Sequence, residues 1–376
     1  MSDPIYLDHN ATTPLLPEVV DAMLPFLREH FGNPSSDHVY GRRAREAVEA
    51  ARERVAALIG AAPSEILFTS GGTEANNLAI LGAAAALPEK RRFVTSIVEH
   101  PATANPCRLL EIEGAEVVRL PVDRTGRICV DDAVRALDER TALVTLMHSN
   151  NETGTLQPVT EVAPAARSAG ALLHTDAAQS VGKVAVRVDE LGVDLLSIAG
   201  HKLYAPKGTG ALYVRAGVTL LPVHWGAAHE RGLRPGTENV ASIVGLGVAC
   251  EIASASLTSA SARVQTLRDE LWSLLRDRIP GVALNGHEDL RLPNTLNVRF
   301  PEVRGSAVLA AAPGVAASTG SACHAGGESA SAALLAMDLS ADEALGAVRL
   351  SLGRGTTAAD VHRAADLLAA AWKDLA

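Results

Sequence analysis

The chain has 376 residues, 47% of them hydrophobic, so it is long enough to bury the cores of two domains or of one large domain with an appendage. Its 34 basic and 43 acidic side chains give a net charge of −9, which argues against nucleic acid as a partner. The first residues lack a basic start followed by an apolar run, so we expect no secretory signal. Its four cysteines form no CxxC pair, which favours the reducing cytoplasm and predicts neither a disulfide framework nor a metal site.

The N-terminal stretch, residues 1–14, is polar and irregular, but Ile5, Tyr6 and Leu7 suggest that part of it packs against the protein. Between Gly41 and Gly60, apolar residues recur at helical spacing with Arg and Glu between them. This pattern predicts an amphipathic helix whose charges form a solvated face.

A repeated unit follows, in which an apolar segment of strand length leads into a small polar cluster and then into a helical pattern. Alternation of this kind predicts an α/β fold with a mostly parallel, doubly wound sheet. Each polar cluster then falls at the carboxyl end of a strand, where one pocket collects all of them. The segments and their clusters are Glu65–Thr69 with residues 70–74, Phe93–Val98 with Glu99 and His100, Leu143–Met147 with residues 150–152, Leu172–Thr175 with residues 176–179, and Leu195–Ala199 with His201 and Lys202.

Lys202 lies just beyond the apolar run that starts at Val193, before a turn rich in Pro and Gly. A partly desolvated lysine there can lose its proton and form a Schiff base with an aldehyde. A lone lysine is more often an ordinary surface residue of a loop, so the hypothesis depends on the other clusters.

Those clusters supply complementary groups, although each has an ordinary structural interpretation. Ser70–Thr73 opens a helix, where free N–H groups favour a phosphate. Asp176 is either a helix N-cap or the partner of a pyridine nitrogen, and His100 is either a core histidine or a ring that stacks on the cofactor. Asn151 and Gln179 suit a phenolic oxygen. Together with Lys202, this set matches the needs of pyridoxal 5′-phosphate (PLP).

The C-terminal part lacks the regular alternation, which predicts a second, smaller domain. We expect a large domain over 15–255 and a small domain made of 1–14 and 256–376. The apolar stretch at Val240–Ala253 reads as a buried helix and not as a membrane span. The elements expected here are a strand at Leu212–Val214, a helical region from Val240 to about Ile279, strands at Thr295–Phe300 and Ala347–Leu352, and a closing helix at Thr357–Leu375.

Nearly end to end, the chain resembles the class V aminotransferase-like group of fold-type I PLP enzymes, and within it the cysteine desulfurases of the NifS and IscS type. The resemblance implies a mostly parallel seven-stranded sheet between helices and a smaller α+β C-terminal domain. The motifs that carry it are YLDHNATTP (6–14), FGNPSSDHVYG (31–41), TSGGTEANNLAI (69–80), VEHPA (98–102), NNETG (150–154), HTDAAQSVGK (174–183), GHKLYAPKGTGALY (200–213), RPGTENV (234–240), STGSAC (318–323) and VRLSLGRGTT (348–357).

The resemblance also implies a role for each site residue. Lys202 carries the cofactor as a Schiff base, Asp176 pairs with its ring nitrogen and His100 stacks on the ring. The implied cofactor-binding residues are Gly72, Thr73, His100, Asn151, Asp176, Gln179, His201 and Lys202, with Thr237 reaching the site of the partner subunit in a homodimer, and the implied substrate-binding residues are Asn33, Asn151 and Arg349.

The implied reaction removes sulfur from L-cysteine and releases L-alanine. Lys202 removes the Cα proton, and the thiolate of Cys323 attacks the substrate sulfur, which leaves a persulfide for a sulfur-acceptor protein. The other three cysteines read as small hydrophobic residues. The acceptor belongs to iron–sulfur cluster assembly, tRNA thiolation or a specialised pathway.

Three departures from the family pattern stand out: Ala199 replaces a hydroxyl residue that contacts phosphate, Pro235 replaces a serine and Ala330 replaces a proline. Two alternatives stay open. One is another PLP reaction on this fold, either a selenocysteine lyase or another C–S lyase, which would still release product without Cys323. The other is a non-catalytic scaffold that binds a sulfur carrier and has no cofactor absorbance.

Overall fold

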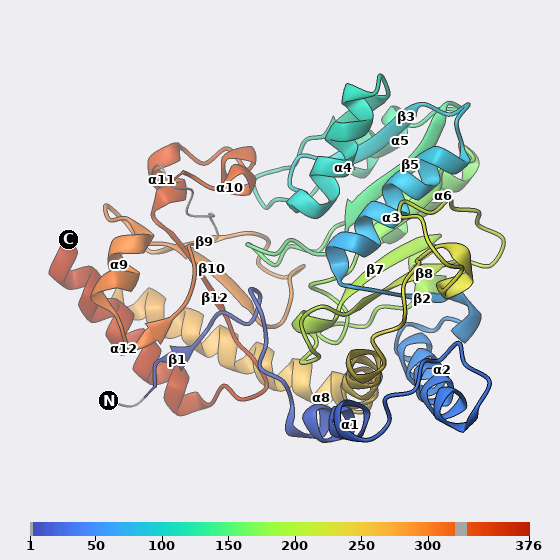
Figure 1. Cartoon of the computed structure of the whole chain (residues 1–376). Helices are drawn as coiled ribbons and strands as arrows, with labels where there is room; N and C mark the ends of the chain where they lie inside the picture. The colour runs from blue at the N-terminus through green and yellow to red at the C-terminus, as the bar shows by residue number, and fades with distance from the viewer. Residues whose placement is uncertain (1–2, 320–328) are drawn as a thin grey trace.

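The computed structural model describes residues 3–319 and 329–376 (Figure 1). Its largest sheet has seven strands in the order β2-β8-β7-β6-β5-β3-β4. Strand β8 runs antiparallel to β2 and β7, and the other neighbouring pairs run parallel, so the predicted mostly parallel seven-stranded sheet is confirmed. The strands are β2 (Ile66–Thr69), β3 (Arg92–Ser96), β4 (Glu116–Leu120), β5 (Thr141–Met147), β6 (Leu172–Asp176), β7 (Leu195–Ala199) and β8 (Gly210–Val214).

Helices cover both faces of this sheet. In β7, Leu195 belongs to the apolar cluster on the side of helices α3 and α4, while Leu196 belongs to the cluster on the side of α2, α6 and α8. Because alternate side chains of a strand point to opposite faces, a sheet covered on both sides needs continuous apolar strands, as seen here. The helices of this part are α1 (Pro17–Arg28), α2 (Val39–Ile59), α3 (Gly72–Ala86), α4 (Pro101–Ile112), α5 (Val130–Ala136), α6 (Val159–Ser168) and α7 (Val188–Leu191), with 3-10 turns η1 (Pro63–Glu65), η2 (Gly200–Lys202) and η3 (Glu230–Gly232).

The second part of the protein is built on a three-stranded antiparallel sheet in the order β12-β10-β9. A parallel pair of β1 and β11 brings the N-terminal stretch beside it, and Ile5 and Leu7 are buried in its core. The elements are β1 (Ile5–Tyr6), β9 (Ala283–Asn285), β10 (Thr295–Arg299), β11 (Val315–Ala316), β12 (Ala347–Ser351), α9 (Gly305–Ala311), α10 (Ala332–Ala336), α11 (Ala341–Leu345) and α12 (Ala358–Leu375).

Helix α8 (Val240–Arg278) runs along both parts (Figure 1). Its residues up to Ala253 pack in the core of the large sheet, and those from Val264 pack in the core of the small one. The predicted boundary after residue 255 therefore falls inside a continuous helix, and the division into domains stays a prediction. Among the described residues, only α8 is long and apolar enough to cross a membrane, and 56% of its most apolar window is buried inside the protein.

Capping residues explain where two of the predicted helices stop or start. Helix α2 stops at Gly60, which has φ +72°, a left-handed conformation that glycine adopts without strain. Helix α12 begins after Thr357, whose hydroxyl accepts from the Asp360 N–H while the Asp360 carboxylate accepts from the Thr357 N–H. This reciprocal cap satisfies two N–H groups that a helix start leaves unpaired.

Candidate active site

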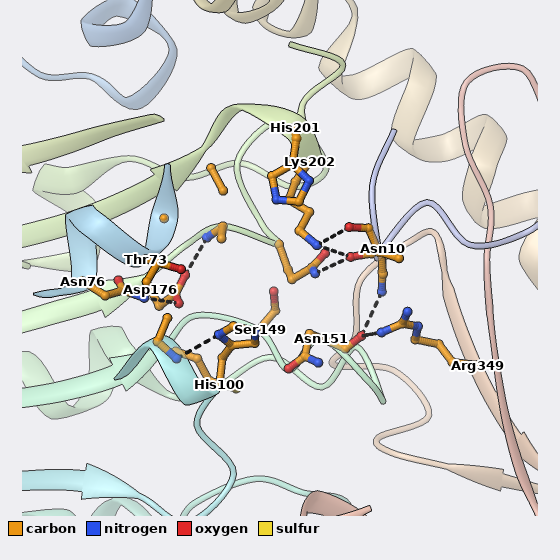
Figure 2. Close-up of a pocket in the computed structure, with 17 residues that line it drawn as sticks. Asn10, Thr73, Asn76, His100, Ser149, Asn151, Asp176, His201, Lys202 and Arg349 are labelled. Atoms are coloured by element: carbon orange, nitrogen blue, oxygen red, sulfur yellow. Dashed lines mark hydrogen bonds between the residues drawn. The ribbon is translucent and has the colours of Figure 1, made fainter. Parts of the chain in front are cut away.

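A cavity of about 320 Å³ opens at the carboxyl ends of the parallel strands (Figure 2). The size is typical of small-molecule sites. At least one residue from each of the five predicted clusters lines it, as expected when parallel strands end at one edge of a sheet. The lining residues are Asn10, Ala11, Gly72, Thr73, Asn76, His100, Ala102, Met147, Ser149, Asn151, Asp176, Ala178, Gln179, Ala199, His201, Lys202 and Arg349.

Lys202 ends the short turn η2 that directly follows β7. Its Nζ donates to the carbonyl oxygens of Asn10 at 2.5 Å and of Ala11 at 2.7 Å. Burial, helped by the charge of Arg349, lowers the pKa of Lys202 to about 8. The side chain is thus an amine that loses its proton much more easily than an exposed lysine does.

Asp176 is the last residue of β6 and is buried at 7% exposure. One carboxylate oxygen accepts from Asn76 Nδ2 at 2.7 Å, and the other accepts from the Ala178 N–H at 2.9 Å. These donors fix the orientation of the carboxylate within the cavity wall. A buried, oriented carboxylate is the group that keeps a pyridine nitrogen protonated.

His100 is the N-cap of helix α4, and its Nδ1 accepts from the Ala102 N–H at 3.1 Å. Burial lowers the pKa of His100, outweighing Asp176, which raises it, and Lys202 lowers it further. A neutral ring with Nδ1 as acceptor carries its proton on Nε2. The position that the sequence predicts for a stacking ring is therefore held by an uncharged imidazole.

The first turn of α3 faces the cavity with Gly72 and Thr73. A Cβ atom on Gly72 would lie 3.2 Å from the Ala199 Cβ, so the glycine allows a close approach of this turn to the end of β7. His201 Nδ1 lies 3.2 Å from Thr12 Oγ1, and burial followed by the charge of Lys202 lowers the pKa of His201 to about 4. Free N–H groups at the start of a 15-residue helix suit an anion.

Arg349 lies in β12, on the side of the cavity opposite Asp176 (Figure 2). Its Nη2 forms an ion pair with Asp8 Oδ1 at 2.8 Å, and its Nη1 donates to the Asn151 carbonyl at 3.1 Å. Its Nε is buried and has no hydrogen-bond partner within residues 3–319 and 329–376. An oriented guanidinium with a donor to spare suits a carboxylate ligand.

Two predicted site residues, Asn33 and Thr237, lie outside the cavity wall, and a third is not among the described residues. Asn33 is exposed, and its Oδ1 accepts from the Ser35 N–H. Thr237 is exposed in the loop before α8. Cys323 lies outside the described residues. Their roles stay predictions.

Sequence reasoning gave no role to Asn10, Asn76 and Ser149, which also line the cavity. Asn10 belongs to the motif YLDHNATTP at 6–14. Its polar side chain within a motif of the family was the feature that could have marked it as a site residue. Asn76 is fully buried in α3. A buried polar side chain needs a partner, and that requirement pointed to a contact such as Asp176.

Residues 5–364 match the family model described as aminotransferase class-V. The chain is 47% identical over 371 residues to a cysteine desulfurase IscS of Dictyoglomus turgidum, covering 98% of this chain and 94% of that protein. It is 46% identical over 362 residues to the cysteine desulfurase NifS of Azotobacter vinelandii, covering 96% and 90%. A solved NifS-like protein superposes with a TM-score of 0.92 at 36% identity, covering 99% of each chain. The chain therefore belongs to the class-V aminotransferase family.

Proposed function

We propose that this protein is a PLP-dependent cysteine desulfurase that converts L-cysteine to L-alanine and passes the sulfur to an acceptor protein. One observation carries the proposal: a single cavity holds an amine, Lys202, a buried carboxylate, Asp176, and an oriented guanidinium, Arg349. Relatives at 46–47% identity that carry this name support it.

The residues of the cavity fit PLP. The turn at Gly72 and Thr73 offers backbone donors for a phosphate, Asp176 offers a negative charge for the ring nitrogen, and Lys202 offers an amine for the aldehyde. Bound there, PLP supplies an electron sink for carbanion chemistry at the Cα of an amino acid. The residues that would hold it are Gly72, Thr73, His100, Asn151, Asp176, Gln179, His201 and Lys202.

The chain's own groups account for substrate binding and proton transfer. Arg349 binds the carboxylate of cysteine through its oriented fork, with Asn33 in a helping role. Lys202, with a pKa of about 8, takes the Cα proton as a base near neutral pH. The same amine then returns a proton to the product carbon.

Sulfur leaves by attack of the Cys323 thiolate on the substrate sulfur. A new S–S bond forms as the C–S bond breaks, and the electron pair of that bond stays with the carbon skeleton. Proton uptake by this carbon yields alanine and leaves a persulfide on Cys323. An acceptor thiol then takes the outer sulfur.

We further infer a homodimer in the cytoplasm, with Thr237 reaching the site of the partner subunit. Large exposed aromatic side chains support a covered interface: Phe31 is 80% exposed and stacks on Tyr40, and Trp225 is 85% exposed. The three described cysteines, Cys107, Cys129 and Cys250, are free thiols.

Incubation of the purified PLP-loaded protein with L-cysteine tests the proposal. We expect alanine and protein persulfide in equal amounts, and neither from the Cys323→Ala variant, which keeps its yellow cofactor. Cys129→Ala removes an exposed thiol and serves as the matched control, with full activity expected. Unchanged alanine release by Cys323→Ala would assign a C–S lyase instead. Absence of cofactor absorbance from the wild type would assign a scaffold.

A further inference from the structure

Lys183 lies behind the wall of the active-site cavity. It lines a second, small cavity of about 40 Å³ together with His9, Tyr204 and Arg354. Its hydrogen-bond partners, Asn10 and Gln179, line the active-site cavity. Lys183 is thus one layer removed from the site and has no part in the reaction described above.

The two hydrogen bonds of Lys183 set the orientation of the Gln179 amide. Lys183 Nζ donates to Gln179 Oε1 at 2.8 Å, and Gln179 Nε2 donates to the Asn10 carbonyl at 2.9 Å. Turning the amide over would place two donors against each other at Lys183 and two acceptors against each other at Asn10. The end of Gln179 beside Asn10 is therefore its donor end.

Asn10 links this arrangement to the reactive amine. Its carbonyl accepts from both Gln179 Nε2 and Lys202 Nζ. Its side-chain Oδ1 accepts from Lys183 Nζ at 3.0 Å and from Asn294 Nδ2 at 3.0 Å, and its Nδ2 donates to Thr295 Oγ1 at 2.8 Å. Lys183 therefore helps to hold the backbone group that receives the Lys202 amine.

The proton affinity of Lys183 agrees with such a role. Burial, with the charges of Lys202 and Arg349, lowers the pKa of Lys183 well below its ordinary range. Nζ donates to two oxygen acceptors, so its contribution to the site includes two directional hydrogen bonds.

We propose that Lys183 is a positioning residue of the cofactor pocket: it holds the Gln179 amide with its donor end toward the Lys202 amine and fixes Asn10 beside both. The inference rests on one part of the proposed function, which is that the pocket binds PLP. A phenolic oxygen next to Gln179 then meets a donor, and loss of Lys183 lets the amide present an acceptor instead.

A double-mutant cycle tests this proposal through PLP affinity, measured by titrating the stripped protein with PLP and following absorbance. We expect Lys183→Met to weaken PLP binding about tenfold and to move the absorbance maximum. Without Lys183 the Gln179 amide is free to turn, and its charge-assisted hydrogen bond to the phenolic oxygen of PLP is lost. In the Gln179→Ala background, the same substitution should weaken binding about threefold or less, because the two residues act together. Equal factors in both backgrounds would overturn the proposal, as would unchanged affinity in Lys183→Met.

Two further variants keep the test decisive. Lys90 is a half-buried lysine far from the cavity lining, and its Nζ donates to the Gly170 carbonyl, so Lys90→Met is the matched control, with unchanged affinity expected. Lys183→Gln replaces the amine by an amide that can donate or accept, and it carries the same cycle if Lys183→Met does not fold. Equal loss of affinity on Lys183→Gln in the wild-type and Gln179→Ala backgrounds would likewise overturn the proposal. Failure of the wild type to bind PLP would instead contradict the proposed function.

Discussion

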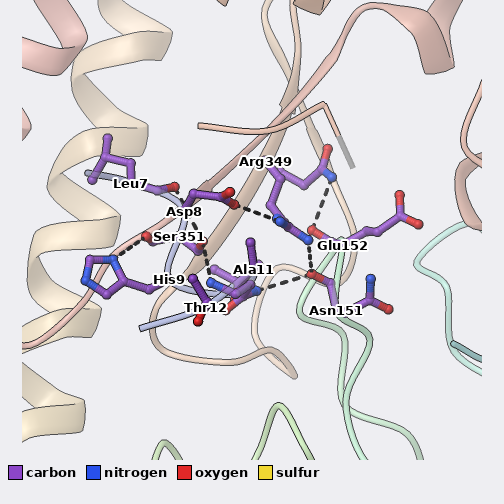
Figure 3. Close-up of polar contacts among 12 residues, drawn as sticks. Leu7, Asp8, His9, Ala11, Thr12, Asn151, Glu152, Arg349 and Ser351 are labelled. Carbon is purple, nitrogen blue, oxygen red and sulfur yellow. Dashed lines mark hydrogen bonds and ion pairs between the residues drawn. The ribbon is translucent and has the colours of Figure 1, made fainter. Parts of the chain in front are cut away.

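Arg349 and Asp8, which lie 341 positions apart in the sequence, form an ion pair of 2.8 Å between Nη2 and Oδ1 (Figure 3). The pair joins the two ends of the chain at the cavity. Together with the bond from Nη1 to the Asn151 carbonyl, it orients the guanidinium before a ligand arrives. Nε stays unpaired within the described part of the chain, so the oriented guanidinium of Arg349 still has a donor for a ligand.

We expect Arg349→Lys to raise the KM for cysteine about 10- to 100-fold with little change in cofactor absorbance, because lysine offers a point charge and no fork for a carboxylate. Steady-state kinetics measure the effect. Arg299→Lys in the neighbouring strand β10 is the control, since Arg299 bonds to Asn285 away from the cavity. A KM within a factor of two of the wild type would remove Arg349 from substrate binding.

Asp176→Asn tests the buried carboxylate. The substitution keeps an oxygen for hydrogen bonding but removes the charge, so we expect kcat to fall by about 100-fold or more. Single-turnover kinetics of alanine formation measure the loss. Asp189→Asn, at an exposed position in α7, should leave kcat unchanged. Activity of Asp176→Asn near that of the wild type would show that no charge is needed at this position.

The pKa of Lys202 predicts the pH dependence of cofactor capture. Below a pKa of about 8 the side chain is protonated and cannot attack an aldehyde, so capture of PLP rises with pH through a midpoint near 8. An ordinary lysine would give a midpoint about two units higher. Arg349→Met removes a charge that lowers this pKa, so its midpoint should move upward. A wild-type midpoint above 10 is incompatible with a desolvated Lys202.

Ala199→Ser restores the hydroxyl that the resemblance leads one to expect at this place. Ala199 lines the cavity near Gly72, so a hydroxyl there can donate to a phosphate. One added hydrogen bond is worth about 0.5–1.5 kcal/mol, and we expect PLP affinity to rise by about two- to tenfold. Ala216→Ser, at an exposed position, is the control. Weaker binding by Ala199→Ser would mean that this alanine is required by packing.

Much of this site follows from the sequence because parallel strands end at a common edge. That rule alone brings Thr73, His100, Asn151, Asp176 and Lys202 to one cavity, although they span a large part of the chain. The strand and helix positions follow from apolar periodicity and from caps such as Thr357.

Contacts between distant segments could not be predicted in this way. The pairing of Arg349 with Asp8 and of Lys183 with Asn10 depends on how the N-terminal stretch crosses the site, which no local pattern specifies. Strand β4 also escaped sequence reasoning, because Glu116–Leu120 is a half-exposed edge strand with only a short apolar signal.

The most direct measurement is a mass map of the PLP-loaded protein after borohydride reduction, which fixes the cofactor to the lysine that carries it. Among the described residues that line the pocket, Lys202 is the one amine, while Lys183 is a second lysine of lowered pKa one layer behind. We expect the reduced adduct on Lys202 alone, and none in Lys202→Ala. An adduct on Lys183 or on a surface lysine of the wild type would contradict the assignment of this cavity as the active site.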